Sequence, residues 1–466
     1  MLLGIVLAAC SGGDDTAETD APSPTDDAHE TAAPTGDTAQ TTPDGCHVGD
    51  DLKVRCPFSR TEPGPIELTL ELPVDGTTLS FTGDPTALSG ELVGWDVVAG
   101  EDVFASVLDR GNLVDSALLP VPVPASADIV VTVEVDGPSV VDRVVFPFAC
   151  SGDPQLMALD ARGRVRWLQP SGGGTQVMPT FATSGRGGVV AVTARESLRE
   201  WRWDGTKVLD LELLDGSLPR LVHHALDTSG ENTFVLDATS QTLSDGQDYI
   251  VDGVTRIAGG EATHAWDMLQ IVDPVGLPGV SGPSYWFQYL GSIDTVHLNS
   301  IDVLADGSWL LSLKHLDTVV KVGRNGQVQW SLLGTPTPLA FQAEALTVAD
   351  KLDPTFQYPH HANLSPWGTL LLSDNGRGSE TTRIVEFAVD EGARTAVVLR
   401  AWDLGMECPV QGSAIGMPDH SVLAVCSRTR TLFELDDDGI RRQTQISCQD
   451  GGGPAIARAY PTNLRD

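Results

Sequence analysis

The chain has few basic residues, with 29 Lys and Arg against 64 Asp and Glu among 466 residues and a net charge of -35. Long-range repulsion then opposes binding to phosphate backbones and anionic lipid surfaces, so the composition excludes a nucleic-acid-binding protein. The sequence also lacks a glycine-rich phosphate loop followed by Lys and Ser or Thr, a G-x-S-x-G motif and an H-E-x-x-H motif. These absences argue against nucleotide hydrolysis, serine hydrolysis and zincin proteolysis.

No C-x-x-C pair occurs among the seven cysteines, which argues against a zinc ribbon or a thioredoxin-like redox site. Besides Cys10 there are six: Cys46, Cys56, Cys150, Cys408, Cys426 and Cys448. An even number in an exported protein predicts three disulfides, and we expect the local pairs Cys46–Cys56 and Cys408–Cys426. The alternative is that some of these residues are buried free thiols.

Candidate helices are scarce, while 48 Gly and 30 Pro punctuate short apolar runs, so the composition predicts an all-β protein with a large core. Within residues 46–150, apolar and polar residues alternate in Ile66–Leu72, Val103–Val107 and Val130–Val135. Such alternation between Asp-Gly and Pro-rich turns predicts a small antiparallel β-sandwich with one wet face. We find no chemistry there and expect a spacer or docking module.

The N-terminal segment is apolar, ends with Leu7-Ala8-Ala9-Cys10 and resembles a bacterial lipoprotein signal. This resemblance implies cleavage before Cys10, lipidation of its thiol and, because Ser11 follows, a place at the outer membrane, facing the periplasm or the cell surface. The alternative is a chance apolar N-terminus, since the segment has no basic residue. Residues 11–45 contain no Lys, Arg, Phe, Trp or Tyr, which predicts a disordered acidic linker.

One pattern recurs five times in residues 151–466: a short polar segment precedes a turn and a strongly apolar strand. Three copies carry histidine and precede Phe234–Asp237, Trp309–Leu311 and Leu370–Ser373; two lack it and precede Val189–Val192 and Val422–Val425. Second hairpins follow most copies, and four-stranded units that recur roughly every 45 to 75 residues are typical of β-propeller blades. The innermost strands of such blades converge, so His224, His297 and His361 are expected to meet at the central channel.

Five of the ten histidines lie at these three strand entrances. A neutral imidazole is a competent nucleophile near pH 7, a second can pass a proton to a leaving oxygen, and a nearby cation can hold a transferring anionic group. A Gly- and Pro-rich loop with Tyr285, Trp286 and Phe287 leads toward His297, and we expect it to shape a substrate pocket.

The repeat region resembles the bacterial arylsulfate sulfotransferases, periplasmic or lipid-anchored enzymes that are independent of phosphoadenylyl sulfate. The resemblance covers roughly Ser151 to Tyr460 in order. It lies in four pieces of sequence: Asp294-x-x-His297-x-Asn299-Ser300, Asp306-Gly307 followed by Leu311-Ser312-x-Lys314, His361 before Ser373-Asp374-Asn375-Gly376, and Arg383–Phe387. It implies a six-bladed β-propeller preceded by a smaller β-domain.

The same resemblance implies ping-pong transfer of a sulfuryl group from an aryl sulfate to a phenol through a sulfohistidine, with no metal, nucleotide or other cofactor. His361 matches the nucleophile, His297 the acid and base, and His224 a further channel histidine. Asn299 would assist the oxyanion. Lys314 stands where the family has Arg, which keeps the charge but loses the bidentate fork.

The residue before the nucleophile is Gln in the family and His360 here, so we assign His360 to the substrate pocket. Thr295 stands where the family has Trp, which also alters the packing of the substrate. His223, His264 and His315 are assigned to packing or surface, and His420 to a turn.

Two alternatives stay open. The chain would be a noncatalytic, lipid-anchored binding propeller if the departure at Lys314 marks lost chemistry. It would be a metalloenzyme if three channel histidines held zinc or iron, but the sequence places no acidic fourth ligand there, so no metal is expected.

Overall fold

The computed structural model describes residues 45–462 except 50, 73–77, 95–96, 99, 122–128, 149, 151–154, 172–179, 194–196, 204, 214–220, 282–290, 336–340, 342–343, 350–351, 377–380 and 450–455. These residues form an all-β structure whose helical elements are the 3-10 turns η1 (Met268–Gln270) and η3 (Lys314–Leu316). No helix in the described ranges is long and apolar enough to cross a membrane. Residues 1–10 with Cys10, the linker up to residue 44, and Tyr285, Trp286 and Phe287 lie outside the described residues.

Two antiparallel sheets come first in the chain. One orders β1 (His47–Val48), β2 (Val54–Ser59) and β5 (Ser89–Gly94); the other orders β4 (Thr78–Thr82), β3 (Ile66–Glu71), β6 (Asp102–Asp109) and β7 (Asn112–Pro120). Ile66, Leu68 and Leu70 are buried and alternate with more exposed residues, as the sequence predicts for one wet face. Cys46 and Cys56 form the predicted disulfide.

Six further sheets of four to six strands follow, three of them four-stranded and each built largely from consecutive strands. The first contains β9 (Arg143–Phe148), β10 (Gln155–Asp160), β11 (Val165–Pro170) and β35 (Tyr460–Thr462). The second contains β12 (Thr180–Ser184), β13 (Gly188–Thr193), β14 (Ser197–Arg202) and β15 (Lys207–Glu212). The third contains β16 (Leu221–Ser229), β17 (Asn232–Thr242), β18 (Asp248–Ala258), β19 (Glu261–Asp267), β20 (Val280–Ser281) and β21 (Ile293–Asp294).

The remaining three sheets continue in chain order. The fourth contains β22 (Leu298–Val303), β23 (Trp309–Leu313), β24 (Thr318–Val322) and β25 (Val328–Leu333). The fifth contains β26 (Thr347–Ala349), β27 (His360–Leu364), β28 (Leu370–Asp374), β29 (Arg383–Asp390) and β30 (Thr395–Asp403). The sixth contains β31 (Ser413–Gly416), β32 (Val422–Cys426), β33 (Thr431–Asp436), β34 (Gly439–Cys448) and β8 (Ile129–Asp136).

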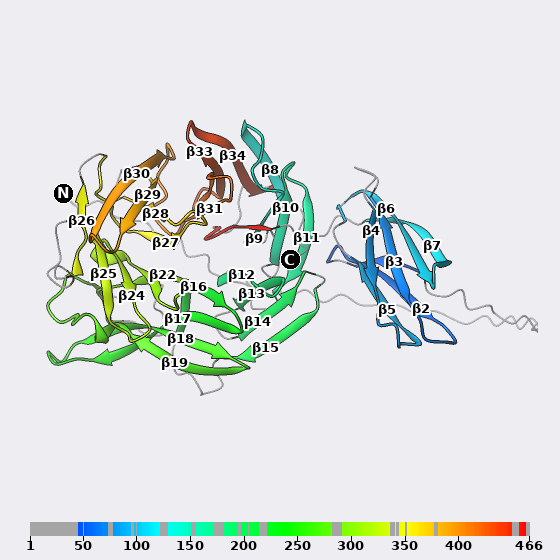
Figure 1. Cartoon of the computed structure of the whole chain (residues 1–466), viewed down its shortest axis with the longest axis horizontal. Coiled ribbons are helices and arrows are strands. Elements are labelled where there is room, and N and C mark those ends of the chain that lie inside the picture. The colour runs from blue at the N-terminus through cyan, green and yellow to red at the C-terminus, as the bar shows by residue number, and fades with distance from the viewer. Residues whose placement is uncertain are drawn as a thin grey trace, which may run out of the picture. The chain divides into compact units, whose positions relative to one another are not determined.

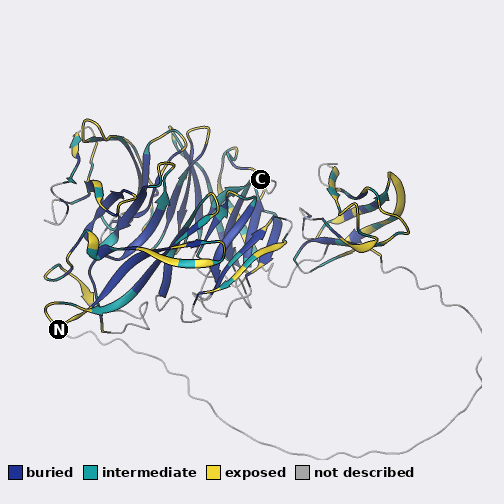
Figure 2. Ribbon diagram, turned by 60° about the horizontal axis from the view of Figure 1, so that its bottom comes forward, coloured by how far each residue is buried: buried dark blue, intermediate teal, exposed yellow. Residues whose placement is uncertain are grey.

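The first strands of these sheets lie next to one another about a common centre. β12 packs on β16, β16 on β22, β22 on β27 and β27 on β31 (Figure 1). These five strands are the five predicted copies of the repeat, including the two without histidine. The second strands of two sheets, β13 and β23, are wholly buried, whereas an outer strand such as β15 carries exposed residues (Figure 2).

A strand from each end of this region completes a sheet formed mainly by the opposite end. β8 pairs with β34, and β35 pairs with β9 through Tyr460 and Val145. A strand from the closing segment thus completes the first sheet. The placement of Val130–Val135 in the N-terminal sandwich is wrong, because alternation shows that a strand exists but does not identify its partner, which here lies more than 300 residues away.

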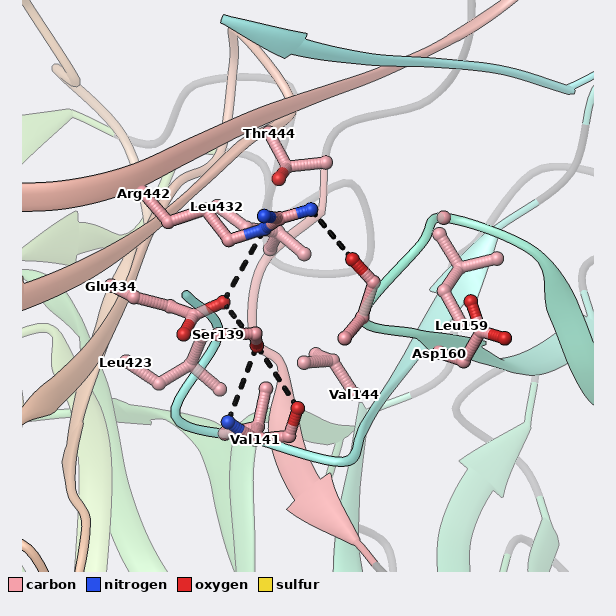
Figure 3. Close-up of a pocket in the computed structure, with 12 residues that line it drawn as sticks. Ser139, Val141, Val144, Leu159, Asp160, Leu423, Leu432, Glu434, Arg442 and Thr444 are labelled. Atoms are coloured by element: carbon pink, nitrogen blue, oxygen red, sulfur yellow. Dashed lines mark hydrogen bonds and ion pairs between the residues drawn. The ribbon is translucent and has the colours of Figure 1, made fainter. Parts of the chain in front are cut away.

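Two further links join the first and last of the six sheets. One link is the disulfide between Cys150 and Cys448. The predicted disulfide between Cys408 and Cys426 also forms, but it is local in the chain. The segment between β8 and β9 lies against β33 and β34 around a small pocket of about 30 Å³ (Figure 3). There Glu434 accepts hydrogen bonds from Ser139 and Val140, and Arg442 donates to the carbonyl of Ala161. We therefore interpret this pocket as a structural junction.

Candidate active site

Three histidines share an unusual backbone conformation. The φ angles are 50° for His224, 56° for His297 and 51° for His361, in the left-handed region that β-carbon sterics disfavour. Each lies at or beside a register shift of the inner strand of its sheet. A bulge of this kind re-aims a side chain, and backbone strain repeated in three neighbouring sheets points to a functional site.

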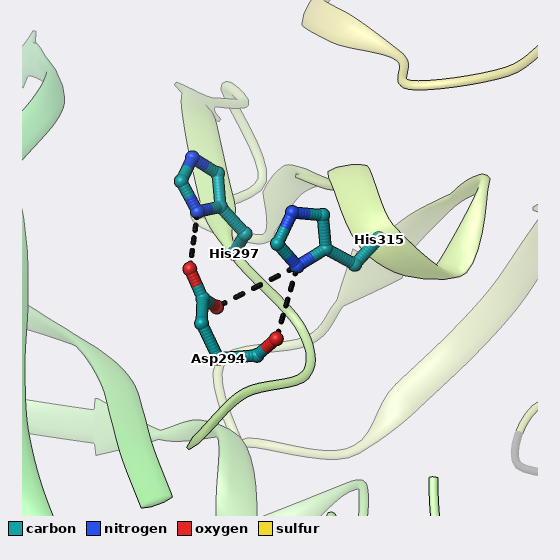
Figure 4. A group of neighbouring side chains, drawn as sticks. All are labelled: Asp294, His297 and His315. Atoms are coloured by element: carbon teal, nitrogen blue, oxygen red, sulfur yellow. Dashed lines mark hydrogen bonds and ion pairs between the residues drawn. The ribbon is translucent and has the colours of Figure 1, made fainter. Parts of the chain in front are cut away.

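His297 is held by an acidic residue three positions earlier. Its Nδ1 donates to Asp294 Oδ2 at 2.6 Å (Figure 4). His315 Nδ1 lies 3.1 Å from the carbonyl oxygen of Asp294, and the rings of His297 and His315 are 4.8 Å apart. Lys314 and His315 reach this position because η3 follows β23, whose Leu313 pairs with Leu298.

His224 contacts His297 directly, with ring centroids 4.7 Å apart. Its Nδ1 lies 2.9 Å from Nδ1 of His223, whose Nε2 is 3.3 Å from Asp252 Oδ1. A carboxylate beside Nε2 of His223 favours a proton there, so Nδ1 of His223 accepts and Nδ1 of His224 donates. The ring from β27 that contacts His224 is that of His360, at 6.1 Å.

His361 is held from the neighbouring sheet. Its Nδ1 donates to the carbonyl of Ala414 at 3.1 Å, so Nε2 carries the lone pair of the neutral ring. Asn363 donates to the same carbonyl at 2.7 Å. The ring lies 6.3 Å from Tyr460 and lines a pocket of about 200 Å³ together with Asp227 and Asp302.

Burial keeps four of these imidazoles neutral. It lowers the pKa of His224, His360 and His361 well below the ordinary value, and the Arg458 charge adds to the effect at His361. Burial also lowers the pKa of His315 to about 4, against the opposing charge of Asp294. Neutral rings with an available nitrogen lone pair are nucleophiles and hydrogen-bond acceptors at neutral pH.

Two cations accompany the histidines. Lys314 has its pKa lowered by burial, with Asp294 opposing that shift, and its Nζ lies 5.6 Å from the ring centroid of Tyr358. Arg458 is 4% exposed and donates from Nη2 to the carbonyl of Asn299 at 3.0 Å. Its buried Nη1 has no hydrogen-bond partner among the described residues.

Several assignments made from the sequence change. His223 and His315, assigned to packing or surface, contact the predicted site histidines, and Arg458 was missed because it lies in the closing segment outside the repeat. Asn299 donates to the carbonyl of Pro359 at 2.9 Å, so at least one of its amide protons supports the segment before β27. Exposed His264 lies outside this cluster, as predicted.

The motif Asp374-Asn375-Gly376 is structural. Asp374 accepts from the backbone of Gln357 at 2.8 Å and from Arg383 Nε at 2.8 Å. Asn375 donates to the carbonyl of Gln411.

Asp294, His297 and His315 are a possible metal-ligand set, since their donor atoms lie within 4.8 Å of one another. In the observed arrangement, however, each Nδ1 faces an oxygen of Asp294 at hydrogen-bond distance, and cationic Lys314 adjoins the group. The geometry fits hydrogen-bonded imidazoles better than ligands arranged about an ion.

Comparison with known proteins identifies the family. The model of the arylsulfotransferase (ASST) family matches residues 134–408, more than half of the chain. Arylsulfate sulfotransferase AssT from Escherichia coli O6:H1 is 31% identical over an alignment that covers 29% of this chain and 27% of that protein.

Among solved structures, a protein of unknown function from Bacteroides caccae matches with a TM-score of 0.38 and 9% identity over 69% of this chain and 99% of its own. Virginiamycin B lyase from Staphylococcus aureus matches with a TM-score of 0.36 and 8% identity over 68% of this chain and 99% of its own. From the match to its family model, this chain belongs to the arylsulfotransferase family.

Proposed function

We propose that the protein transfers a sulfuryl group from an aryl sulfate to a phenol, independently of phosphoadenylyl sulfate, by a ping-pong mechanism through a sulfated His361. Family membership supports the reaction class. The observation that carries the assignment of the nucleophile is the hydrogen bond from Nδ1 of His361 to Ala414, which leaves the lone pair on Nε2 of a buried neutral ring.

In the first half-reaction, Nε2 of His361 attacks sulfur, the N–S bond forms and the S–O bond to the aryl group breaks. The leaving oxygen takes a proton from His297. Departure of the phenol gains from this proton donor, because a free phenol has a pKa of about 10. In the second half-reaction, the acceptor phenol returns a proton to His297 while its oxygen takes the sulfuryl group and the N–S bond breaks.

The negative charge of the transferring group needs cations in the desolvated centre. Arg458 and Lys314 are the candidates, and Arg458 acts electrostatically on both His360 and His361. Its planar guanidinium can contact two sulfuryl oxygens, as the ammonium group of Lys314 cannot. Arg458 thus compensates for the lysine at position 314. His224 and Asn299 would contact the remaining oxygens, and His360 the substrate.

The same proposal covers the setting of the enzyme. We interpret the six sheets as the blades of a β-propeller that follows a β-sandwich. Three disulfides are typical of an oxidising compartment. They support export, with a lipid anchor on Cys10 and a place at the outer membrane. No cofactor takes part in the proposed chemistry.

The test is mass spectrometry after incubation of the purified protein with 4-nitrophenyl sulfate and no acceptor. We expect one added SO3 on the peptide that contains His360 and His361, and addition of phenol should remove it. His361→Ala should abolish the adduct and His360→Ala should retain it. A wild-type protein that binds the sulfate ester but acquires no SO3 would instead be a noncatalytic binding protein.

A further inference from the structure

One carboxylate contacts two imidazoles in the candidate site. Oδ2 of Asp294 accepts from His297 Nδ1 at 2.6 Å, while His315 Nδ1 lies 3.1 Å from the Asp294 carbonyl oxygen and 3.7 Å from Oδ1. The side chain of Asp294 is 2% exposed, and those of His297 and His315 are 10% and 14% exposed. Both rings are therefore largely shielded from competing water.

These contacts determine the tautomer of both rings. Carboxylate and carbonyl oxygens only accept hydrogen bonds, so the Nδ1 atoms of His297 and His315 must carry the protons. Figure 4 shows that the second nitrogen of each ring points away from Asp294, and that the two point to the same side. The rings lie beside each other, with an interplanar angle of 33°.

The backbone holds this arrangement in place. The left-handed conformation of His297 turns its ring back toward Asp294. The amide of Lys314 donates to the carbonyl of His297, and that of His315 donates to the carbonyl of Val296. These two hydrogen bonds join the segment 294–297 to η3. Asp294 can therefore position both imidazoles at once.

We propose that Asp294 is the positioning residue that aims Nε2 of His297 and Nε2 of His315 at one reacting oxygen. His297 exchanges the proton with the phenol oxygen in both half-reactions, and the carboxylate stabilises its protonated ring. The single O–H of the incoming acceptor first donates a hydrogen bond to Nε2 of neutral His315, and its proton passes to Nε2 of His297 as the oxygen takes the sulfuryl group, so the site selects an un-ionised phenol. This inference rests on the sulfotransferase activity proposed above.

The tautomers can be measured without turnover, by NMR of the full-length protein labelled with 15N in its histidine rings. We expect His297 and His315 to be protonated at Nδ1, their signals being assigned by loss in His297→Gln and His315→Gln. Asp294→Ala should shift His297 toward the other tautomer and leave the tautomer of His315 unchanged, because the backbone carbonyl that accepts from His315 remains. Asp306→Asn, which changes an exposed carboxylate in the turn between β22 and β23, is the matched control and should shift neither ring.

The two half-reactions separate the roles of the rings. Asp294→Asn should slow both the burst of 4-nitrophenol and the transfer to phenol, by about 10²-fold or more, because His297 serves both steps. His315→Phe should leave the burst unchanged and raise the KM for phenol about tenfold, as expected for one lost hydrogen bond. Equal slowing of both steps in His315→Phe would contradict its role toward the acceptor.

An unchanged tautomer of His297 in Asp294→Ala would overturn the positioning role. One equivalent of tightly bound zinc that is lost in Asp294→Ala would also overturn it, since the trio would then be a metal site. A wild-type protein without any sulfuryl transfer would disprove the proposed function, and the NMR comparison alone would then decide whether Asp294 pairs the rings.

Discussion

His361 on β27 and Ala414 on β31 are joined by a hydrogen bond of 3.1 Å between the imidazole Nδ1 and the backbone carbonyl. The proposed nucleophile is therefore oriented by the adjacent sheet, and its geometry depends on how two sheets pack. Asn363 supports the same carbonyl and also donates to the backbone of His361 at 2.8 Å.

Asn363→Ala should lower both stability and turnover. Its buried amide makes two hydrogen bonds to backbone carbonyls, and their loss is expected to cost about 1–3 kcal/mol of unfolding free energy. Chemical denaturation and the burst rate measure the two effects. Asn363→Asp removes the same donors and should be at least as damaging, whereas a variant as stable and active as wild type would contradict the supporting role.

Arg458→Met should reduce sulfuryl transfer by about 10²–10³-fold, the range found when one donor to a developing charge is removed. Arg458→Lys should recover part of this loss, because it restores the charge but not the planar fork. The rate of 4-nitrophenol release reports the effect. Exposed Arg324 in the fourth sheet offers a control, and Arg324→Met should behave as wild type.

Lys314→Arg should extend activity to higher pH. Burial lowers the pKa of Lys314, so its charge is present at low pH and is lost as pH rises to that lowered pKa, below the usual range. An arginine keeps its charge throughout this range. Rate profiles from pH 7 to 10 should show an alkaline decline for wild type that is weaker in Lys314→Arg. Identical profiles would show that Lys314 does not bear on the reaction.

Asp302→Asn should stabilise the protein increasingly as pH rises from about 4 to 7. Burial and the neighbouring Asp227 raise the pKa of Asp302 to about 7, above its ordinary value of 3.8. The folded state therefore binds a proton more tightly than the unfolded chain, and that stabilisation is complete below the ordinary pKa and lost as pH rises through the raised one. Asparagine can keep the hydrogen bond from Leu364 without acquiring charge. Denaturation of both proteins at several pH values should show the gap widening, and a constant gap would contradict the raised pKa.

Removing the disulfide between Cys150 and Cys448 by a double change to serine should cost about 2–5 kcal/mol, since the bridge closes a loop of nearly the whole region. Thermal unfolding with and without reductant should show the loss. The disulfide between Cys408 and Cys426 closes a much shorter loop, with a sequence separation of 18 residues. Its removal by a double change to serine should therefore cost less. Equal losses would show that loop length does not determine the effect.

The repeat made much of this architecture predictable. Polar entrances before apolar strands located the inner strands of five sheets, and the same alignment selected His224, His297 and His361, which share one backbone conformation. Local cysteine spacing was sufficient for two of the three disulfides. Each of these signals is short-range or periodic, and such signals survive in a single sequence.

Features that depend on distant partners were not predictable. Nothing in Val130–Val135 identifies β34 as its neighbour, and Arg458 belongs to no repeat, so its approach to Asn299 appears only in three dimensions. His315 was assigned to packing because its partner Asp294 lies 21 residues earlier, across a hairpin and a 3-10 turn. The register shift that gives adjacent His360 and His361 different surroundings likewise has no signal in the sequence.

The terminal strand β35 follows Arg458 by two residues and contains Tyr460, whose ring borders His361. The pairing of β35 with β9 that completes the first sheet therefore also brings a cation and an aromatic ring to the histidines of the candidate site. A molecule in which β35 has not paired with β9 would hold the histidines without Arg458, so the proposed sulfuryl transfer would report that these two strands, more than 300 residues apart, have docked.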